Sequence, residues 1–76
     1  MTNMEKARLD KGLKIVELAK LCGYSHVSII GWEKGHRQAS KLALWTVGKA
    51  LEVPEDERLE LQEECVLLEV FESATD

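Results

Sequence analysis

The chain has 76 residues, of which 45% are hydrophobic and 32% are charged. This length supports one small core, and the composition is that of a globular domain rather than a disordered tail. No apolar run reaches the roughly 18–20 residues that a membrane-spanning helix needs, and the first residues lack a secretory pattern, so we expect a cytoplasmic protein with no membrane partner.

The net charge of −4 is unevenly distributed along the chain. Residues 1–50 carry nine basic and four acidic side chains, whereas residues 51–76 carry one basic and ten acidic side chains. The charge of each segment governs which partner it attracts, so the first segment is compatible with a phosphate-bearing partner. Two solvated helix faces of opposite charge account for the distribution equally well, and charge alone does not decide between them.

The spacing of hydrophobic residues predicts helices throughout, with no segment that alternates like a strand. A first helix begins after Thr2 or Asn3, either of which can cap it, and ends at Gly12. A second helix covers about residues 14–22, and Gly23 ends it.

The next two helices begin at serine caps. Ser25 precedes a third helix over residues 26–34, which ends at Gly35. Ser40 precedes a fourth helix over about residues 41–51.

A last helix is predicted over residues 54–72, followed by a flexible tail at 73–76. Acidic residues follow Pro54 at its start, where the helix dipole favours them. Its later turns are apolar around most of their circumference, which one small core cannot cover. We therefore expect this helix to form a dimer or partner interface through Leu61, Cys65, Leu68 and Phe71.

The most informative unit is the short connection between the second and third helices. About three residues join them, which forces the two helices to cross sharply. Ala19 is small where the helices approach, and Gly23 supplies a positive φ at the turn. The amino-terminal end of the third helix should then project, and a helix fits the major groove of DNA. This pattern favours a helix-turn-helix, although small helical bundles that bind proteins share much of it.

Several short motifs from Gly12 to Gly35 occur at a spacing without insertions: Gly12-Leu13, Glu17-Leu18-Ala19, Gly23-Tyr24-Ser25, Ile29, Trp32-Glu33 and Gly35. Through them, residues 3–53 resemble the Cro/C1-type helix-turn-helix family of phage repressors and bacterial regulators. The resemblance implies an all-α, lambda-repressor-like fold of five short helices, with a DNA-binding domain at 1–53. It also implies a homodimer that reads a double-stranded DNA operator with the third helix.

The resemblance further implies roles for individual residues. Arg8 and Glu33 occupy the positions of a partly buried ion pair between the first and third helices. The expected base-reading residues, on the exposed face of the third helix, are His26, Val27, Ser28 and Gly31. The expected phosphate contacts are Lys14, Ser25, Lys34, His36, Arg37 and Lys41.

Two departures from the family pattern leave a second function open. Lys14 and Ile15 stand where the family usually has Thr or Ser followed by Gln. The third helix contains Val27 and Ile30 and has no Arg, Asn or Gln for bidentate contacts with bases. We expect a sequence-specific transcriptional regulator of the repressor type. The alternative is a modified helix-turn-helix protein acting through protein contact, such as an antirepressor or a co-regulator of another repressor.

Other chemistry is not indicated by the sequence. Cys22 and Cys65 are far apart and are expected to be reduced, and His26 and His36 have no zinc-site spacing. There is no nucleophile and base pair at a productive spacing and no glycine-rich phosphate loop. We therefore expect no enzymatic activity, no metal and no cofactor.

Overall fold

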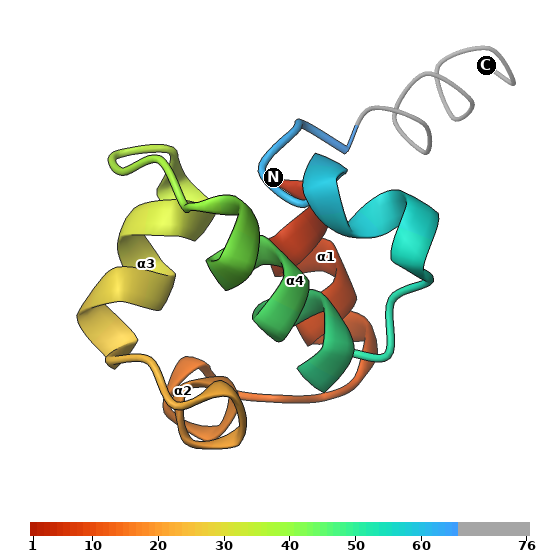
Figure 1. Cartoon of the computed structure of the whole chain (residues 1–76). Helices are drawn as coiled ribbons and strands as arrows, with labels where there is room; N and C mark the ends of the chain where they lie inside the picture. Colours follow the sequence, from red (N-terminus) through yellow and green to blue (C-terminus); the bar gives the residue numbers. More distant parts are fainter. Residues whose placement is uncertain (66–76) are drawn as a thin grey trace, which may run out of the picture.

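The structure is a computed structural model that describes residues 1–65. Four α-helices and one 3₁₀-helix follow one another (Figure 1): α1 (Asn3–Asp10), α2 (Ile15–Cys22), α3 (His26–Lys34), α4 (Lys41–Ala50) and η1 (Glu55–Glu60). Within residues 1–65 no strand forms, and Thr2 and Glu64 make an isolated antiparallel bridge. The all-α class and the five helices are confirmed. Over the same residues, no helix combines the length and apolar character that crossing a membrane requires.

Local hydrogen bonds explain where the helices begin. The hydroxyl oxygens of Thr2, Ser25 and Ser40 each accept from the backbone N–H three residues later, at 3.3, 3.2 and 3.1 Å. These bonds start α1, α3 and α4 by satisfying N–H groups that have no acceptor within the helix. At the start of α2, the backbone N–H of Lys14 donates to Glu17 Oε1 at 2.7 Å.

The core lies where the five helices meet. Each helix, or the residue that follows it, supplies one of the largest fully buried side chains: Met4, Leu18, Ile29, Val47 and Leu61. Because the last of these follows η1, the core extends past residue 53 into the acidic end of the described chain.

A buried ion pair joins α1 to α3. Arg8 Nε and Nη2 donate to the two carboxylate oxygens of Glu33 at 2.8 and 3.1 Å, and Arg8 Nη1 donates to the carbonyl of Leu13 at 2.8 Å. The side chains of Arg8 and Glu33 are 8% and 1% exposed. The pair is therefore bidentate, and it holds the inner side of α3 against α1.

The helix predicted over residues 54–72 begins where expected, but the prediction that it continues is wrong for residues 61–65. Residues Glu55–Glu60 form a 3₁₀-helix, and the chain then turns away from helical geometry. The physical reason lies at the start of α1, where the N–H groups of Asn3 and Met4 lack acceptors in their own helix. They donate instead to the carbonyls of Glu63 and Leu61, both at 2.8 Å. A continuing helix would use those carbonyls itself.

The dimer or partner interface predicted on that helix is also corrected in part. Leu61 is only 2% exposed and packs in the core, so its assignment to a dimer or partner interface is wrong. Cys65 is half-buried, and its backbone N–H donates to the carbonyl of Met1 at 2.8 Å. The other two predicted interface residues, Leu68 and Phe71, and the tail at 73–76 lie outside the described residues.

Replacement of Glu33 with alanine should cost about 3–5 kcal/mol of unfolding free energy, because it leaves the buried guanidinium of Arg8 without its partner. Urea unfolding of the purified variant measures this loss. Asp10→Ala is the matched control, because its ion pair with Lys6 is exposed and contributes little. Equal losses in the two variants would contradict a special role for the buried pair.

Leu61→Ala should cost about 2–5 kcal/mol, since it removes a fully buried side chain from the core. Leu59→Ala provides the comparison, because Leu59 is 50% exposed two residues earlier. Thermal and urea unfolding of both variants would test this. If Leu59→Ala were the more destabilising change, the result would contradict the burial of Leu61 in the core.

Candidate nucleic-acid interface

A short turn sets the direction of α3. Gly23 ends α2 with φ +79°, and its N–H donates to the carbonyl of Ala19 at 2.9 Å. Tyr24 then packs edge-on against Trp32 of α3, with ring centroids 5.0 Å apart, before Ser25 caps the next helix. The positive φ is one that glycine adopts without strain, so the chain can reverse within three residues. Figure 1 shows the result, with α3 at the outside of the molecule beside α2.

The first turn of α3 is open to a partner. His26 and Val27 are exposed, with Val27 at 53%, and Ser28 is half-buried. Ser25 is exposed at the cap, and its hydroxyl donates to Ser28 Oγ at 3.1 Å. Ile29, on the other side of the helix, is completely buried and anchors it. The leading edge of α3 therefore projects while its inner face is fixed.

Gly31 is the one predicted base-reading residue that the structure removes from this exposed face. The N–H groups of His36 and Arg37 both donate to its carbonyl, at 2.9 and 3.2 Å, which folds the following loop back over α3. The side chain of Arg37 covers Gly31, and a Cβ there would lie 3.0 Å from Arg37 Cδ. Gly31 is therefore buried, and its prediction as a base-reading residue was wrong: it provides room for Arg37.

Basic side chains lie on the elements before and after α3. His36 and Arg37 lie in the loop that follows it, Lys41 begins α4, and Lys14 caps α2, and all four are exposed. Lys34, at the end of α3, is partly neutralised because its Nζ lies 3.5 Å from Glu5 Oε2. The predicted phosphate-contacting cations are thus distributed over three elements next to α3.

The cations of α1 and of the residue that follows it are paired. Lys6 donates to Asp10, and this hydrogen bond, with the carboxylate charge, raises the pKa of Lys6. Lys11 donates to Glu52, which lowers the pKa of Glu52 by the same two effects. These charges are committed to carboxylates within the domain.

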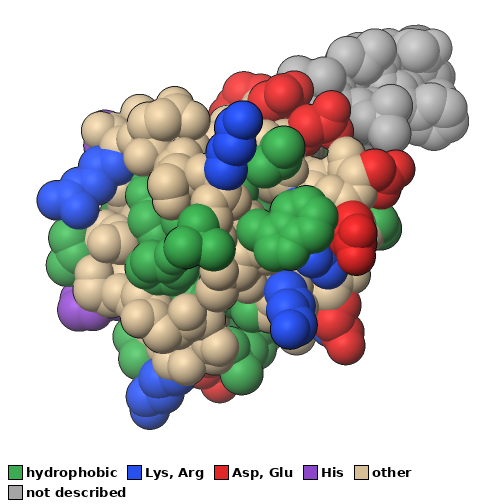
Figure 2. All heavy atoms as spheres, viewed as in Figure 1, with side chains coloured by type: hydrophobic (Ala, Val, Ile, Leu, Met, Phe, Trp, Pro, Cys, Tyr) green, Lys and Arg blue, Asp and Glu red, His purple; other side chains and the backbone are tan. Residues whose placement is uncertain are grey.

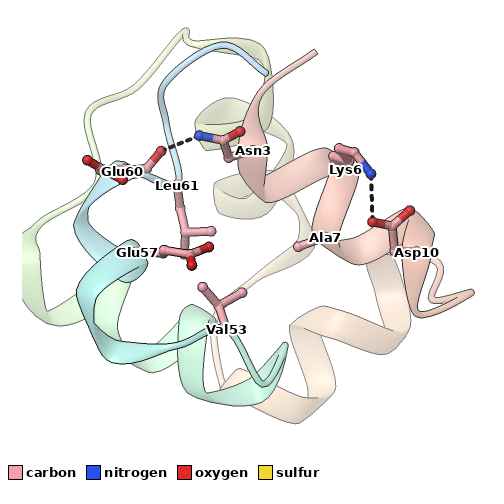
Figure 3. Close-up of a pocket in the computed structure, with 8 residues that line it drawn as sticks. All are labelled: Asn3, Lys6, Ala7, Asp10, Val53, Glu57, Glu60 and Leu61. Carbon is pink, nitrogen blue, oxygen red and sulfur yellow. Dashed lines mark hydrogen bonds and ion pairs between the residues drawn. The ribbon is translucent and has the colours of Figure 1, made fainter. Parts of the chain in front are cut away.

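Acidic side chains gather at the opposite end of the molecule from α3. Figure 2 shows them over η1 and the segment that follows it. A hollow of about 230 Å³ lies there between α1 and η1 (Figure 3), lined by Asn3, Lys6, Ala7, Asp10, Val53, Glu57, Glu60 and Leu61. Its carboxylates would repel a phosphate backbone, so the hollow does not belong to the candidate interface.

Apolar side chains are also exposed near the candidate interface. On α3, Ile30 is 38% exposed in addition to Val27, whereas Ile15 of α2 is half-buried against the core. On α4, Leu42 is 70% exposed, and apolar side chains are visible over that helix in Figure 2. The sequence analysis singled out Val27 and Ile30 of α3 and did not single out Leu42 of α4.

Sequence reasoning also missed Gln62, which holds the loop between α3 and α4. Its side-chain amide donates to the carbonyls of Trp32 and Arg37 at 3.2 and 2.8 Å. Its amide oxygen accepts from the N–H of Ala39 at 2.8 Å and from Gln38 Nε2 at 3.1 Å. A single glutamine in an acidic stretch carries no signal for such a role, because its partners lie more than twenty residues away in the sequence.

A comparison with protein families matches this geometry. A family model described as helix-turn-helix matches residues 4–58, which is more than half of the chain and covers α1 from its second residue and the whole of α2, α3 and α4. A search of curated proteins found no match.

Proposed function

The chain belongs to the Cro/C1-type helix-turn-helix family of DNA-binding regulators, and from this membership we propose that it is a sequence-specific, repressor-type transcriptional regulator. In this proposal α3 enters the major groove of an operator, and the protein acts in the cytoplasm of a bacterial cell or of a phage host.

The observation that carries the proposal is the open first turn of α3, together with exposed basic side chains on the elements before and after this helix. His26 can donate to or accept from a base edge, Ser28 can do the same through its hydroxyl, and Val27 can pack on a thymine methyl group. These contacts are single rather than bidentate, so each base is discriminated less strongly than by Arg, Asn or Gln. Phosphate contacts then supply much of the affinity.

Phosphate contacts are proposed on both sides of α3. Arg37 and Lys41 lie after the helix, where the loop and the start of α4 present their exposed side chains. Lys14 lies before it at the start of α2, and the hydroxyl of Ser25 stands at the start of α3 itself. Such contacts fix the register of a protein on the duplex without reading its sequence.

We further propose that the protein acts as a homodimer. Two copies related by a two-fold axis would present their α3 helices about one DNA turn apart, roughly 34 Å. Cys65 lies at the end of the described chain, and the apolar residues Leu68 and Phe71 follow it in the sequence. Their apolar character supports a dimer interface beyond residue 65. The acidic side chains of the same segment would be repelled by DNA, so this segment would face away from the duplex.

A second candidate function is supported by the chemistry of α3. Val27 and Ile30 are 53% and 38% exposed on a helix that contains no Arg, Asn or Gln. Apolar exposure of this kind is typical of protein interfaces. In this alternative the domain binds another repressor and acts as an antirepressor or a co-regulator.

Arg37→Ala and Lys41→Ala should each weaken binding to all DNA sequences and lower the slope of log affinity against log salt by about one, because each removes one phosphate contact. Fluorescence anisotropy with a labelled random-sequence duplex, titrated at several salt concentrations, gives both quantities. Lys49→Ala is the matched control, because Lys49 is exposed on the same helix about 12 Å from Lys41 along the axis. A slope that falls equally in the control would place the contacts elsewhere.

Selection of bound duplexes from a random pool should enrich one motif for the wild-type protein. Val27→Ala should relax the preference for thymine at a single position in that motif, because the valine no longer packs on the methyl group. The protein-directed alternative predicts no motif, together with capture of a DNA-binding repressor from host extract that Val27→Glu abolishes.

A further inference from the structure

We propose that Gln62 is a positioning residue for DNA binding: it orders the loop between α3 and α4 and thereby prepares Arg37 for its phosphate contact. This inference rests on the proposed function. Gln62 lies after the segment that matches the helix-turn-helix family, which ends at residue 58. It belongs to the segment after η1, whereas the residues that it holds belong to α3 and the loop.

The side-chain amide of Gln62 pairs with the loop as a neighbouring strand would. It donates to the carbonyl of Arg37 at 2.8 Å and accepts from the N–H of Ala39 at 2.8 Å, so it brackets Gln38 from both sides. The same nitrogen donates to the carbonyl of Trp32 in the last turn of α3, at 3.2 Å. One side chain therefore connects the end of α3 with the loop that leaves it.

Only a primary amide of this length meets these demands. Glutamine supplies two N–H donors and one oxygen acceptor on a single group. Glutamate would set a carboxylate oxygen against the carbonyls of Trp32 and Arg37, where donors are needed. Methionine has a similar shape but can replace neither the donors nor the acceptor, and asparagine is one methylene shorter.

The backbone of Arg37 is held on both sides by this arrangement. Its N–H donates to the carbonyl of Gly31 at 3.2 Å, and its carbonyl accepts from Gln62. Between these two bonds, its side chain leaves the loop across Gly31. A side chain whose starting point is fixed loses less freedom when it contacts a phosphate, and this lowers the cost of binding.

Gln62 is itself well fixed. The preceding residue, Leu61, is buried in the core, and the carbonyl of the following residue, Glu63, accepts from the N–H of Asn3 at 2.8 Å. The backbone of Gln62 is thus held between two anchored neighbours, and its side-chain amide fixes the loop relative to the core. No movement of the loop is needed before Arg37 meets a phosphate.

The test combines Gln62→Met with Arg37→Ala in the full-length chain, using anisotropy with a labelled random-sequence duplex. Gln62→Met should weaken binding about two- to tenfold, the cost of ordering one long side chain. Arg37→Ala should then have a smaller effect in the Gln62→Met background than in the wild type, because the two residues act through one contact. Lys41→Ala should have the same effect in both backgrounds. Leu59→Met is the control for an uncharged change in the same region.

A second measurement separates positioning from a loss of stability. Urea unfolding, repeated at several temperatures, identifies a temperature at which every variant is folded. At that temperature, amide hydrogen exchange follows the N–H of Ala39, which should exchange faster in Gln62→Met than in the wild type. If Gln62→Met prevents folding, Gln62→Asn replaces it in the same cycle, with a smaller effect in the same direction.

The outcomes distinguish this inference from the proposed function. If the wild-type protein binds no duplex at low salt, both are overturned. If the wild-type protein binds and Arg37→Ala has the same effect in both backgrounds, or Gln62→Met binds as the wild type does, DNA binding stands and the positioning role of Gln62 is overturned.

Discussion

The bidentate pair between Arg8 and Glu33 is the interaction on which the presentation of α3 depends. A carboxylate that is 1% exposed needs a partner, and the guanidinium from α1 supplies two parallel hydrogen bonds. The third nitrogen of the guanidinium holds the carbonyl of Leu13, between α1 and α2. One side chain thus joins three parts of the domain, and it fixes the inner face of α3 while the outer face remains open.

The segment after η1 connects three other parts of the domain. Leu61 fills the core, the carbonyls of Leu61 and Glu63 receive the first N–H groups of α1, and Gln62 holds the loop after α3. These three consecutive residues therefore act on the core, the beginning of the chain and the candidate interface. The acidic end of the chain is part of the structure that supports the basic face, although its charge is unsuited to contact DNA.

The candidate interface combines two kinds of chemistry on one surface. The first turn of α3 offers His26, Val27 and Ser28, which are proposed to make single contacts with bases, and the exposed cations Arg37 and Lys41 follow the helix in the loop and at the start of α4. This combination favours binding in which phosphates supply affinity and a few bases adjust it. The same apolar exposure on α3 suits a protein partner, so the chemistry of this helix carries both candidate functions.

Local signals were enough to predict α1 to α4, their serine caps and the sharp turn between α2 and α3, because serine caps, glycine ends and helical periodicity act within a few residues. The sequence also placed most of the exposed residues of α3 correctly. The prediction failed at Gly31, because the side chain of Arg37, from a loop that folds back over α3, buries this residue. It also failed at residues 61–65. There the carbonyls of Leu61 and Glu63 accept instead from the N–H groups of Asn3 and Met4, which lie some sixty residues earlier in the chain and have no acceptor within α1. These points and the contacts of Gln62 follow from the packing of distant segments, since each depends on hydrogen bonds between parts of the chain whose proximity no local pattern encodes.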